Sequence, residues 1–219
     1  MRWDRCSSPR RARQAEHSQG FSLVELLVVL ALLSVIVGIG LPAMLNSLNR
    51  SRLAAFAQQT ASAMQAARLE AIKRSTVTRV EIHFSANSNS VTAYVDTNKN
   101  NVYDPPNPST PTANDILIFQ VTAPAGVVYQ GPGTTANSNA VYGFDTISGG
   151  GVVLFNSDGS VSKQGGFRIR DQRANIMEVF VSPQASARIA VRKYAGNPNG
   201  GDDPTLYFES DESPGWTWN

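Results

Sequence analysis

Residues 20–42 read GFSLVELLVVLALLSVIVGIGLP, and the rest of the chain is organised around this stretch. Between Phe21 and Leu41 the only charged side chain is Glu25. Folded as a helix, these residues would be about 31 Å long at 1.5 Å per residue, close to the hydrocarbon thickness of a lipid bilayer. The stretch therefore predicts one membrane-spanning helix over residues 21–42.

The left border of the apolar stretch carries a second signal. A basic, polar leader ends at Gly20, the apolar residues begin at Phe21, and an acid follows at Glu25. This border resembles the prepilin cleavage and methylation site of type IV filament proteins, which Leu23, the run 26–30 and Pro42 also match. The resemblance implies that a prepilin peptidase removes residues 1–20 after Gly20 and that the new N-terminal residue, Phe21, is methylated.

The charge of Glu25 is energetically unfavourable in a membrane-spanning helix. A carboxylate in a membrane helix costs about 2.5–3.5 kcal/mol at the helix centre and less near an end. Glu25 either lies close enough to the cytoplasmic headgroups to stay solvated or needs a partner after assembly. The resemblance implies that this partner is the amino group of Phe21 in a neighbouring subunit, since opposite charges attract strongly where water is scarce.

Charge, cysteine and histidine usage exclude several classes of protein. Five of the 19 Lys and Arg residues and two of the 17 Asp and Glu residues lie in the leader, so its removal changes the net charge from +2 to about −1. The leader arginines predict a cytoplasmic N-terminus. Cys6 lies in the leader, so the processed chain has no disulfide. His83 is then its only histidine, without a Gly-x-Ser-x-Gly motif, and we expect no enzymatic activity.

The remainder of the chain predicts a helix followed by many short strands. Apolar residues recur near a 3.6-residue period at Leu45, Leu48, Phe56, Ala63, Ala67 and Ala71, which predicts one helix over about 22–73. Alternating or apolar runs predict strands at 77–84, 91–96, 116–122, 127–130, 151–156, 161–162, 166–170, 177–181 and 187–194. Residues 104–114 and 131–139 are rich in Pro, Gly and Asn and predict exposed loops.

These elements predict an α+β protein. A long N-terminal membrane-spanning helix packs on an antiparallel sheet or on two sheets. We expect three parts: a cleaved leader (1–20), a spine helix (21–75) and a β-rich globular domain (76–219).

Three segments resemble the GspH/FimT family of minor pilins and pseudopilins: 66–74 (AARLEAIKR), 154–161 (LFNSDGSV) and 166–169 (GFRI). The resemblance implies a minor, non-catalytic subunit of a type II secretion pseudopilus or a type IV pilus. Its implied partners are other pilins or pseudopilins, the prepilin peptidase and an assembly platform in the bacterial inner membrane. The implied location is that membrane, crossed once, with the globular domain in the periplasm and later in the filament.

The segment 96–104 (DTNKNNVYD) is a candidate calcium loop. Asp96, Asn98, Asn100 and Asp104 stand at positions 1, 3, 5 and 9, as in loops of the Asp-x-Asp/Asn-x-Asp/Asn type. Asn101 stands where such loops have glycine, and the usual glutamate at position 12 is absent. The alternative is a turn held by Asp and Asn side chains without a metal. Calcium is the only cofactor that the sequence suggests.

Arg188, Arg192 and Lys193 are candidate DNA-binding residues. Arg188 and Arg192 share one face of a predicted strand, and residues 187–190 resemble a degraded form of the glycine-arginine motif with which some FimT-type pilins bind DNA. The alternative function is therefore a DNA-binding minor pilin in DNA uptake. Five acids in the tail oppose phosphate binding: Asp202, Asp203, Glu209, Asp211 and Glu212. Trp216 and Trp218 near the C-terminus cover either a sheet edge or a neighbouring subunit.

Overall fold

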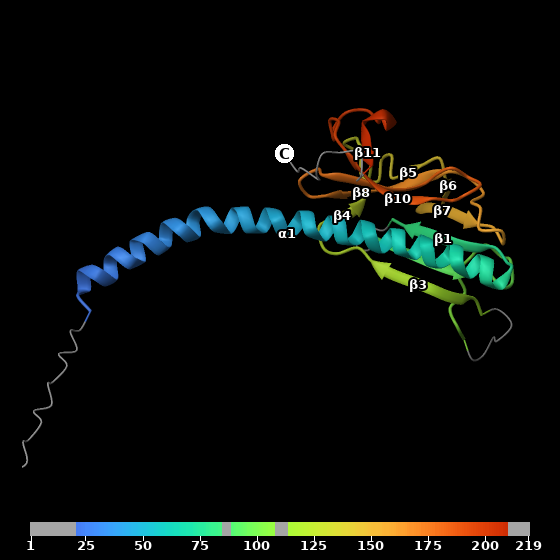
Figure 1. The fold of residues 1–219 in the computed structure, drawn as a ribbon, viewed down its shortest axis with the longest axis horizontal. Helices are drawn as coiled ribbons and strands as arrows, with labels where there is room; N and C mark the ends of the chain where they lie inside the picture. Colours follow the sequence, from blue (N-terminus) through green and yellow to red (C-terminus); the bar gives the residue numbers. More distant parts are fainter. Residues whose placement is uncertain (1–20, 85–88, 108–113, 210–219) are drawn as a thin grey trace, which may run out of the picture. The chain divides into compact units, whose positions relative to one another are not determined.

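A computed structural model describes residues 21–84, 89–107 and 114–209 (Figure 1). Helix α1 (Leu23–Arg74) comes first and every strand follows it. The chain divides into two compact units, residues 1–44 and residues 45–219, so the second half of α1 belongs to the same unit as the strands. The predicted leader lies outside the described residues, and its removal stays a prediction.

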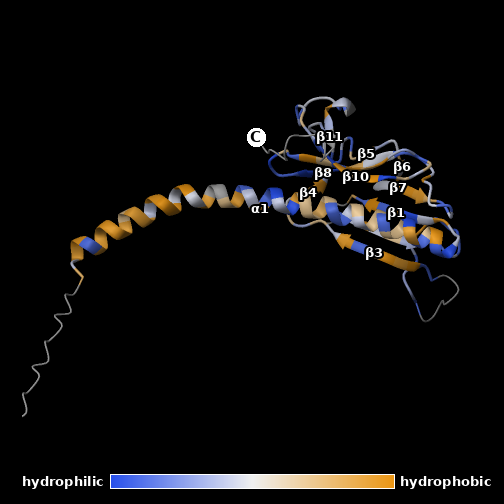
Figure 2. Cartoon of the chain, viewed as in Figure 1, coloured by the Kyte–Doolittle hydropathy of each residue, from blue (hydrophilic) through white to orange (hydrophobic). Residues whose placement is uncertain are grey.

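The first half of α1 is apolar on every side. All large hydrophobic side chains from Leu23 to Leu41 are exposed, and Figure 2 shows this part of the helix as mostly hydrophobic. Among the described residues α1 is the one helix that is long and apolar enough to cross a membrane.

The second half of α1 buries one stripe against the strands. Leu53, Phe56, Met64, Ala67 and Ala71 are each at most 1% exposed. The stripe begins later than the sequence predicted, because Leu45 and Leu48 are 56% and 41% exposed. Alanine leaves room for close approach, so the strands can lie directly against the helix.

Helix α1 ends where its backbone turns left-handed. Ser75 has φ 50°, and the amides of Ser75 and Thr76 donate to the carbonyls of Ile72 and Ala71. Lys73 and Arg74 in the last turn pair with Glu70 and complement the negative end of the helix dipole.

The strands form two antiparallel sheets. Sheet A has the order β3 (Ile116–Thr122), β2 (Ser90–Val95), β1 (Thr78–His83), β7 (Gly150–Phe155) and β6 (Asp145–Ile147). Sheet B has the order β11 (Tyr207–Glu209), β10 (Ile189–Tyr194), β9 (Ile176–Val181), β8 (Gly165–Asp171) and β4 (Val127–Tyr129), and β5 (Val141–Tyr142) also pairs with β8. A short 3-10 helix, Pro204–Leu206, precedes β11.

One hydrophobic core joins the second half of α1 to both sheets. Tyr129 lies near its centre, with ring contacts to Phe56 at 5.6 Å and Phe84 at 6.1 Å, and its hydroxyl lies 3.4 Å from that of Thr60. The α+β prediction, with a long helix on antiparallel sheets, is confirmed.

Two further details of the sequence prediction are wrong. In the predicted strand 77–84, Arg79, Glu81 and His83 alternate with apolar residues, which is typical of a strand with one side in solvent. Arg79 and Glu81 are nevertheless only 7% and 4% exposed, because the loop after β2 covers that side. The segment 131–139 was expected to be exposed, but Gly131 and Pro132 are buried. An added Cβ at Gly131 would lie 2.3 Å from the Asn139 carbonyl, so the two ends of this segment are packed against each other.

Candidate functional site

The N-terminal end of α1 carries the predicted assembly residues. Phe21 is 80% exposed and precedes the helix, while Glu25 is exposed in its first turn. The first hydrogen bond runs from the Leu26 amide to the Ser22 carbonyl at 3.1 Å, so the preceding amide groups at this end lack helical partners. A carboxylate is favourable near such an end. Gly20 lies outside the described residues.

Residues 96–104 form a turn that brings the four candidate calcium ligands together. The Asp96 carboxylate accepts from the amides of Asn100 and Asn101. The side-chain amides of Asn98 and Asn100 donate to Asp104 Oδ2 at 2.8 and 2.7 Å. Asn101 has φ 66°, the left-handed conformation that asparagine tolerates.

Asp115 closes the base of this turn. Its two carboxylate oxygens accept from the amides of Thr97 and Asp104 at 2.8 and 2.9 Å. No group of three or more His, Cys, Asp or Glu side chains in the described residues could hold a metal. A cation at this turn would therefore need oxygens from Asn98 and Asn100 beside Asp96 and Asp104, and calcium stays a prediction.

The same turn covers a buried polar cluster on β1 and β2. Arg79 Nη1 donates to Asn101 Oδ1 at 2.8 Å, and Arg79 and the Tyr94 hydroxyl both donate to Glu81 Oε1. Burial alone would raise the pKa of Glu81, but hydrogen bonds with His83, Tyr94 and Arg79 outweigh it and lower that pKa. Burial and the adjacent Glu81 raise the pKa of the Tyr94 hydroxyl. The charged groups of this cluster are therefore hydrogen-bonded to one another and to the turn that covers them, which indicates a structural role.

A second buried cluster holds one of the three candidate DNA-binding residues. Glu178 on β9 has no exposed surface and accepts from Arg192 through Oε2 and from Arg168 through Oε1, the latter at 2.9 Å. The Arg192 guanidinium also lies 3.7 Å from the centre of the Phe180 ring. Arg192 is thus tied to a buried acid, which reduces its value as a phosphate ligand.

Arg168 is the residue of this cluster that the sequence analysis missed. It is 1% exposed, donates from Nη1 to Asp202 Oδ2 at 2.6 Å, and lies 4.8 Å from the ring centres of both Tyr142 and Tyr207. Burial lowers its pKa, but the coulombic effect of Glu178 and the adjacent groups raises the net pKa of Arg168. A signal was present, because Glu178 stands alone in the apolar strand IMEVFV and needs a cation.

The other two candidate DNA-binding residues lie in different surroundings. Arg188 lines a groove with Gln65, Arg68 and Leu69 of α1. Lys193 lies near Arg50, and burial followed by that like charge lowers the pKa of Lys193. The structure does not gather Arg188, Arg192 and Lys193 into one continuous basic surface.

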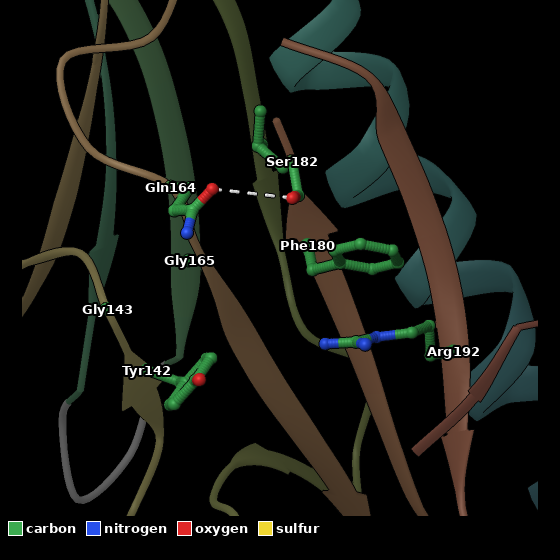
Figure 3. Close-up of a pocket in the computed structure, with 8 residues that line it drawn as sticks. Tyr142, Gly143, Gln164, Gly165, Phe180, Ser182 and Arg192 are labelled. Atoms are coloured by element: carbon green, nitrogen blue, oxygen red, sulfur yellow. Dashed lines mark hydrogen bonds between the residues drawn. The ribbon is translucent and has the colours of Figure 1, made fainter. Parts of the chain in front are cut away.

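Arg192 borders a pocket of about 340 Å³ on sheet B (Figure 3). Figure 3 shows Tyr142 at one side and Phe180 with Arg192 at the other, and the Ser182 hydroxyl lies 3.4 Å from Gln164 Oε1. The other lining residues are Gly143, Gly165 and Val181. Ser182 has no general base among these residues, so the lining offers no nucleophile activated for catalysis.

Two protein-family models match this chain, one over the globular unit and one over the start of α1. The family model of type II transport protein GspH matches residues 57–193, from the buried half of α1 to β10. The chain belongs to the GspH family. The prokaryotic N-terminal methylation motif matches residues 17–41, which include Gly20, Phe21 and Glu25. This GspH family member is therefore a type IV pilin-like minor pseudopilin of the GspH/FimT group, as the sequence resemblance predicted.

A named relative supports the same assignment. The pilin-like protein PilA1 of Thermus thermophilus is 39% identical over 87 residues, which cover 40% of this chain and 54% of the relative. The matched region thus spans about half of that protein. No solved structure matches the chain. GspH and pilin families consist of structural subunits that assemble with other pilins into filaments, and the apolar helix with its methylation motif fits membrane anchoring.

Proposed function

We propose that this protein is a minor subunit that primes or caps a type II secretion pseudopilus. The observation that carries the proposal is the match of 57–193 to type II transport protein GspH behind a methylation motif at 17–41. In this proposal a prepilin peptidase cleaves after Gly20, and an inner-membrane platform then extracts the helix into the filament. The globular domain lies in the periplasm, and the subunit has no enzymatic activity.

A type IV pilus is the second candidate system, supported by the named relative, which is called pilin-like. Deletion of the gene separates the two systems, since loss of a secreted enzyme from the medium supports secretion and loss of surface pili supports a pilus. DNA uptake is less well supported, because Arg192 is bound to the buried Glu178. A gel-shift affinity that falls steeply with salt would favour DNA binding over both.

Processing is the first test of the proposal. Glycine has no side chain, so Gly20 fits a narrow peptidase site at the membrane surface where a larger residue would clash. We expect mass spectrometry of the membrane-bound protein to find a methylated Phe21 at the N-terminus. Gly20→Leu should leave a precursor with the leader attached, whereas Ser22→Ala should be processed normally. A mature N-terminus at any other residue would overturn the proposed processing.

A further inference from the structure

We propose that the free edge of β3 (Ile116–Thr122) is a docking site for an extended, uncharged segment of a partner protein, which adds one strand to sheet A. Among the described residues, β3 stands at the border of sheet A and pairs with β2 alone. A border strand presents a row of amide and carbonyl groups with which another extended chain can pair. This inference concerns the globular unit and does not depend on the secretion system.

Strand β3 differs from the other border strands of the two sheets. It has seven residues, whereas β4, β6 and β11 have three each. Strand β6 also carries a charge, Asp145, which pairs with Lys163. The sequence of β3, ILIFQVT, contains no charge and no proline. Short length, charge and proline keep border strands from pairing with other chains, so β3 lacks the protection that the other border strands have.

Backbone hydrogen bonds indicate which amides of β3 point away from β2. The Ala123 amide donates to the Asn89 carbonyl at 2.7 Å, directly after the end of β3. Antiparallel pairs alternate between hydrogen-bonded and non-hydrogen-bonded. The Val121 amide therefore points toward β2, and the amides of Gln120 and Thr122 point outward.

A second hydrogen bond gives the same result from the other side of β1. The Phe84 amide donates to the Gly149 carbonyl at 2.6 Å, next to the pairing of β1 with β7. Counting the alternation from this bond across β1 and β2 directs the backbone groups of Val91 toward β3. The outward direction of the Gln120 amide thus follows from two separate bonds, and Gln120 itself is exposed.

The two faces of β3 determine which side chains a partner strand needs. Phe119 and Val121 pack against the hydrophobic core, whereas Gln120 between them is exposed. Ile116 and Leu117 at the start of β3 are 38% and 41% exposed. Neighbouring strands contact each other through side chains on the same face, so the partner segment needs an apolar side chain at every second position and no charge.

A second copy of β3 fits this edge less well. Figure 1 shows β3 running in the direction opposite to the second half of α1. Antiparallel pairing of two copies would therefore set their helices in opposite directions, whereas subunits that share one membrane through this helix run the same way. Parallel pairing would turn one sheet over and put its polar face beside the core face of the other. An extended segment of a partner avoids both conflicts.

Hydrogen exchange measured by NMR on the full chain in detergent micelles tests the proposal. The probe is a blocked peptide of alternating threonine and valine, and the control is the same peptide with proline as its central residue, which removes an amide. Without peptide, we expect the amides of Gln120 and Thr122 to exchange faster than that of Val121. Millimolar probe peptide should slow both by about tenfold or more, and the proline peptide should not.

Two variants separate strand addition from binding elsewhere. Gln120→Pro removes an outward amide at a border position, where proline is tolerated, and should weaken binding of the probe peptide by about tenfold or more. Gln120→Ala keeps that amide and should bind the peptide within about twofold of the parent chain. Thermal melts by circular dichroism establish that both variants are folded. If Gln120→Pro unfolds, Thr122→Pro takes its place, because it removes the next outward amide.

Other results would overturn the proposal. Amides of Gln120 and Thr122 that are protected before peptide is added would mean that the chain itself covers this edge. Protection that grows with the concentration of the chain alone would assign the edge to a second copy. Equal binding of the two peptides, or equal binding to the proline and alanine variants, would place the peptide elsewhere on the molecule.

Discussion

Single buried charges hold parts of this fold together that are distant in sequence. Glu178 joins β9 to Arg168 on β8 and to Arg192 on β10, and Arg168 in turn holds Asp202. A buried carboxylate without a cation would be costly, so each partner here stabilises the folded state by compensating the burial of another. The segment that leads to β11 is thereby fixed to the middle of sheet B.

Replacing Arg168 tests this role. Because Glu178 keeps Arg192 but Asp202 loses its partner, Arg168→Leu should lower the free energy of unfolding by about 3 kcal/mol. The control is Lys163→Ala, which removes an exposed ion pair with Asp145 and should cost less than about 1 kcal/mol. Chemical denaturation of both variants measures the difference, and equal losses would mean that the buried network contributes no more than a surface pair.

Glu81 predicts a pH dependence with a definite sign. Its folded pKa is lowered below the ordinary value of about 4.3. Its contribution to stability is therefore complete above that value and is lost as the pH falls through the lowered folded pKa. Glu81→Gln should flatten the stability curve below about pH 4.3, whereas Glu70→Gln, at a half-buried site on α1 whose partner Lys73 is exposed, should flatten it less. Unfolding curves at several acidic pH values measure both, and an unchanged slope in Glu81→Gln would contradict the assignment.

At the scale of elements, local sequence patterns predicted the long segments well. The helix was expected over 22–73 and runs from Leu23 to Arg74, and the third strand has the predicted bounds, Ile116–Thr122. Both predictions rest on local signals, because the period of the apolar residues and the basic last turn that ends the helix lie within the segments themselves. Strands β5, β6 and β11 were missed because two or three residues carry no period and form only by pairing with longer strands.

Non-local contacts explain the remaining differences. The covered face of β1 depends on the loop at 96–104, which the alternation of Arg79, Glu81 and His83 does not reveal. The exposure of Leu45 and Leu48 depends on where the strands begin to cover α1, which the helical period does not reveal either. The position of Phe21 and Glu25 at one end of the helix was predictable, but any contact between two chains is not contained in one sequence.

The turn at 96–104 is the element on which a metal prediction depends. If Asp96, Asn98, Asn100 and Asp104 bind calcium, millimolar calcium should raise the melting temperature above that in chelator, because a ligand of the native state stabilises it by mass action. Asp104→Asn should abolish this difference. Asp158→Asn is the matched control, since Asp158 accepts from the amide and hydroxyl of Ser160 in another turn. Identical melting curves of the parent chain in calcium and chelator would leave the metal-free turn.

The whole molecule combines a helix suited to lipid with a folded β-rich domain. Among the described residues, the hydrophobic core begins at Leu53 in the second half of α1 and includes strands of both sheets. The apolar side chains of the first half of α1, and Glu25, are exposed, which suits contact with lipid or with other subunits.

Glu25 is the residue at which we expect assembly and membrane residence to make opposite demands. In lipid its charge is a cost, so Glu25→Leu should insert and be processed at least as well as the parent chain. In a filament, where the carboxylate is proposed to neutralise the amino group of a neighbour's Phe21, the same change should reduce incorporation.

The measurement is the fraction of subunit in sheared filaments relative to the membrane pool, with Glu70→Gln as an acid-removing control on the same helix. A subunit at the extreme tip has no neighbour ahead of it, so its position must be established first. Normal incorporation of Glu25→Leu in a subunit below the tip would refute charge pairing and leave Glu25 as a solvated residue near the headgroups.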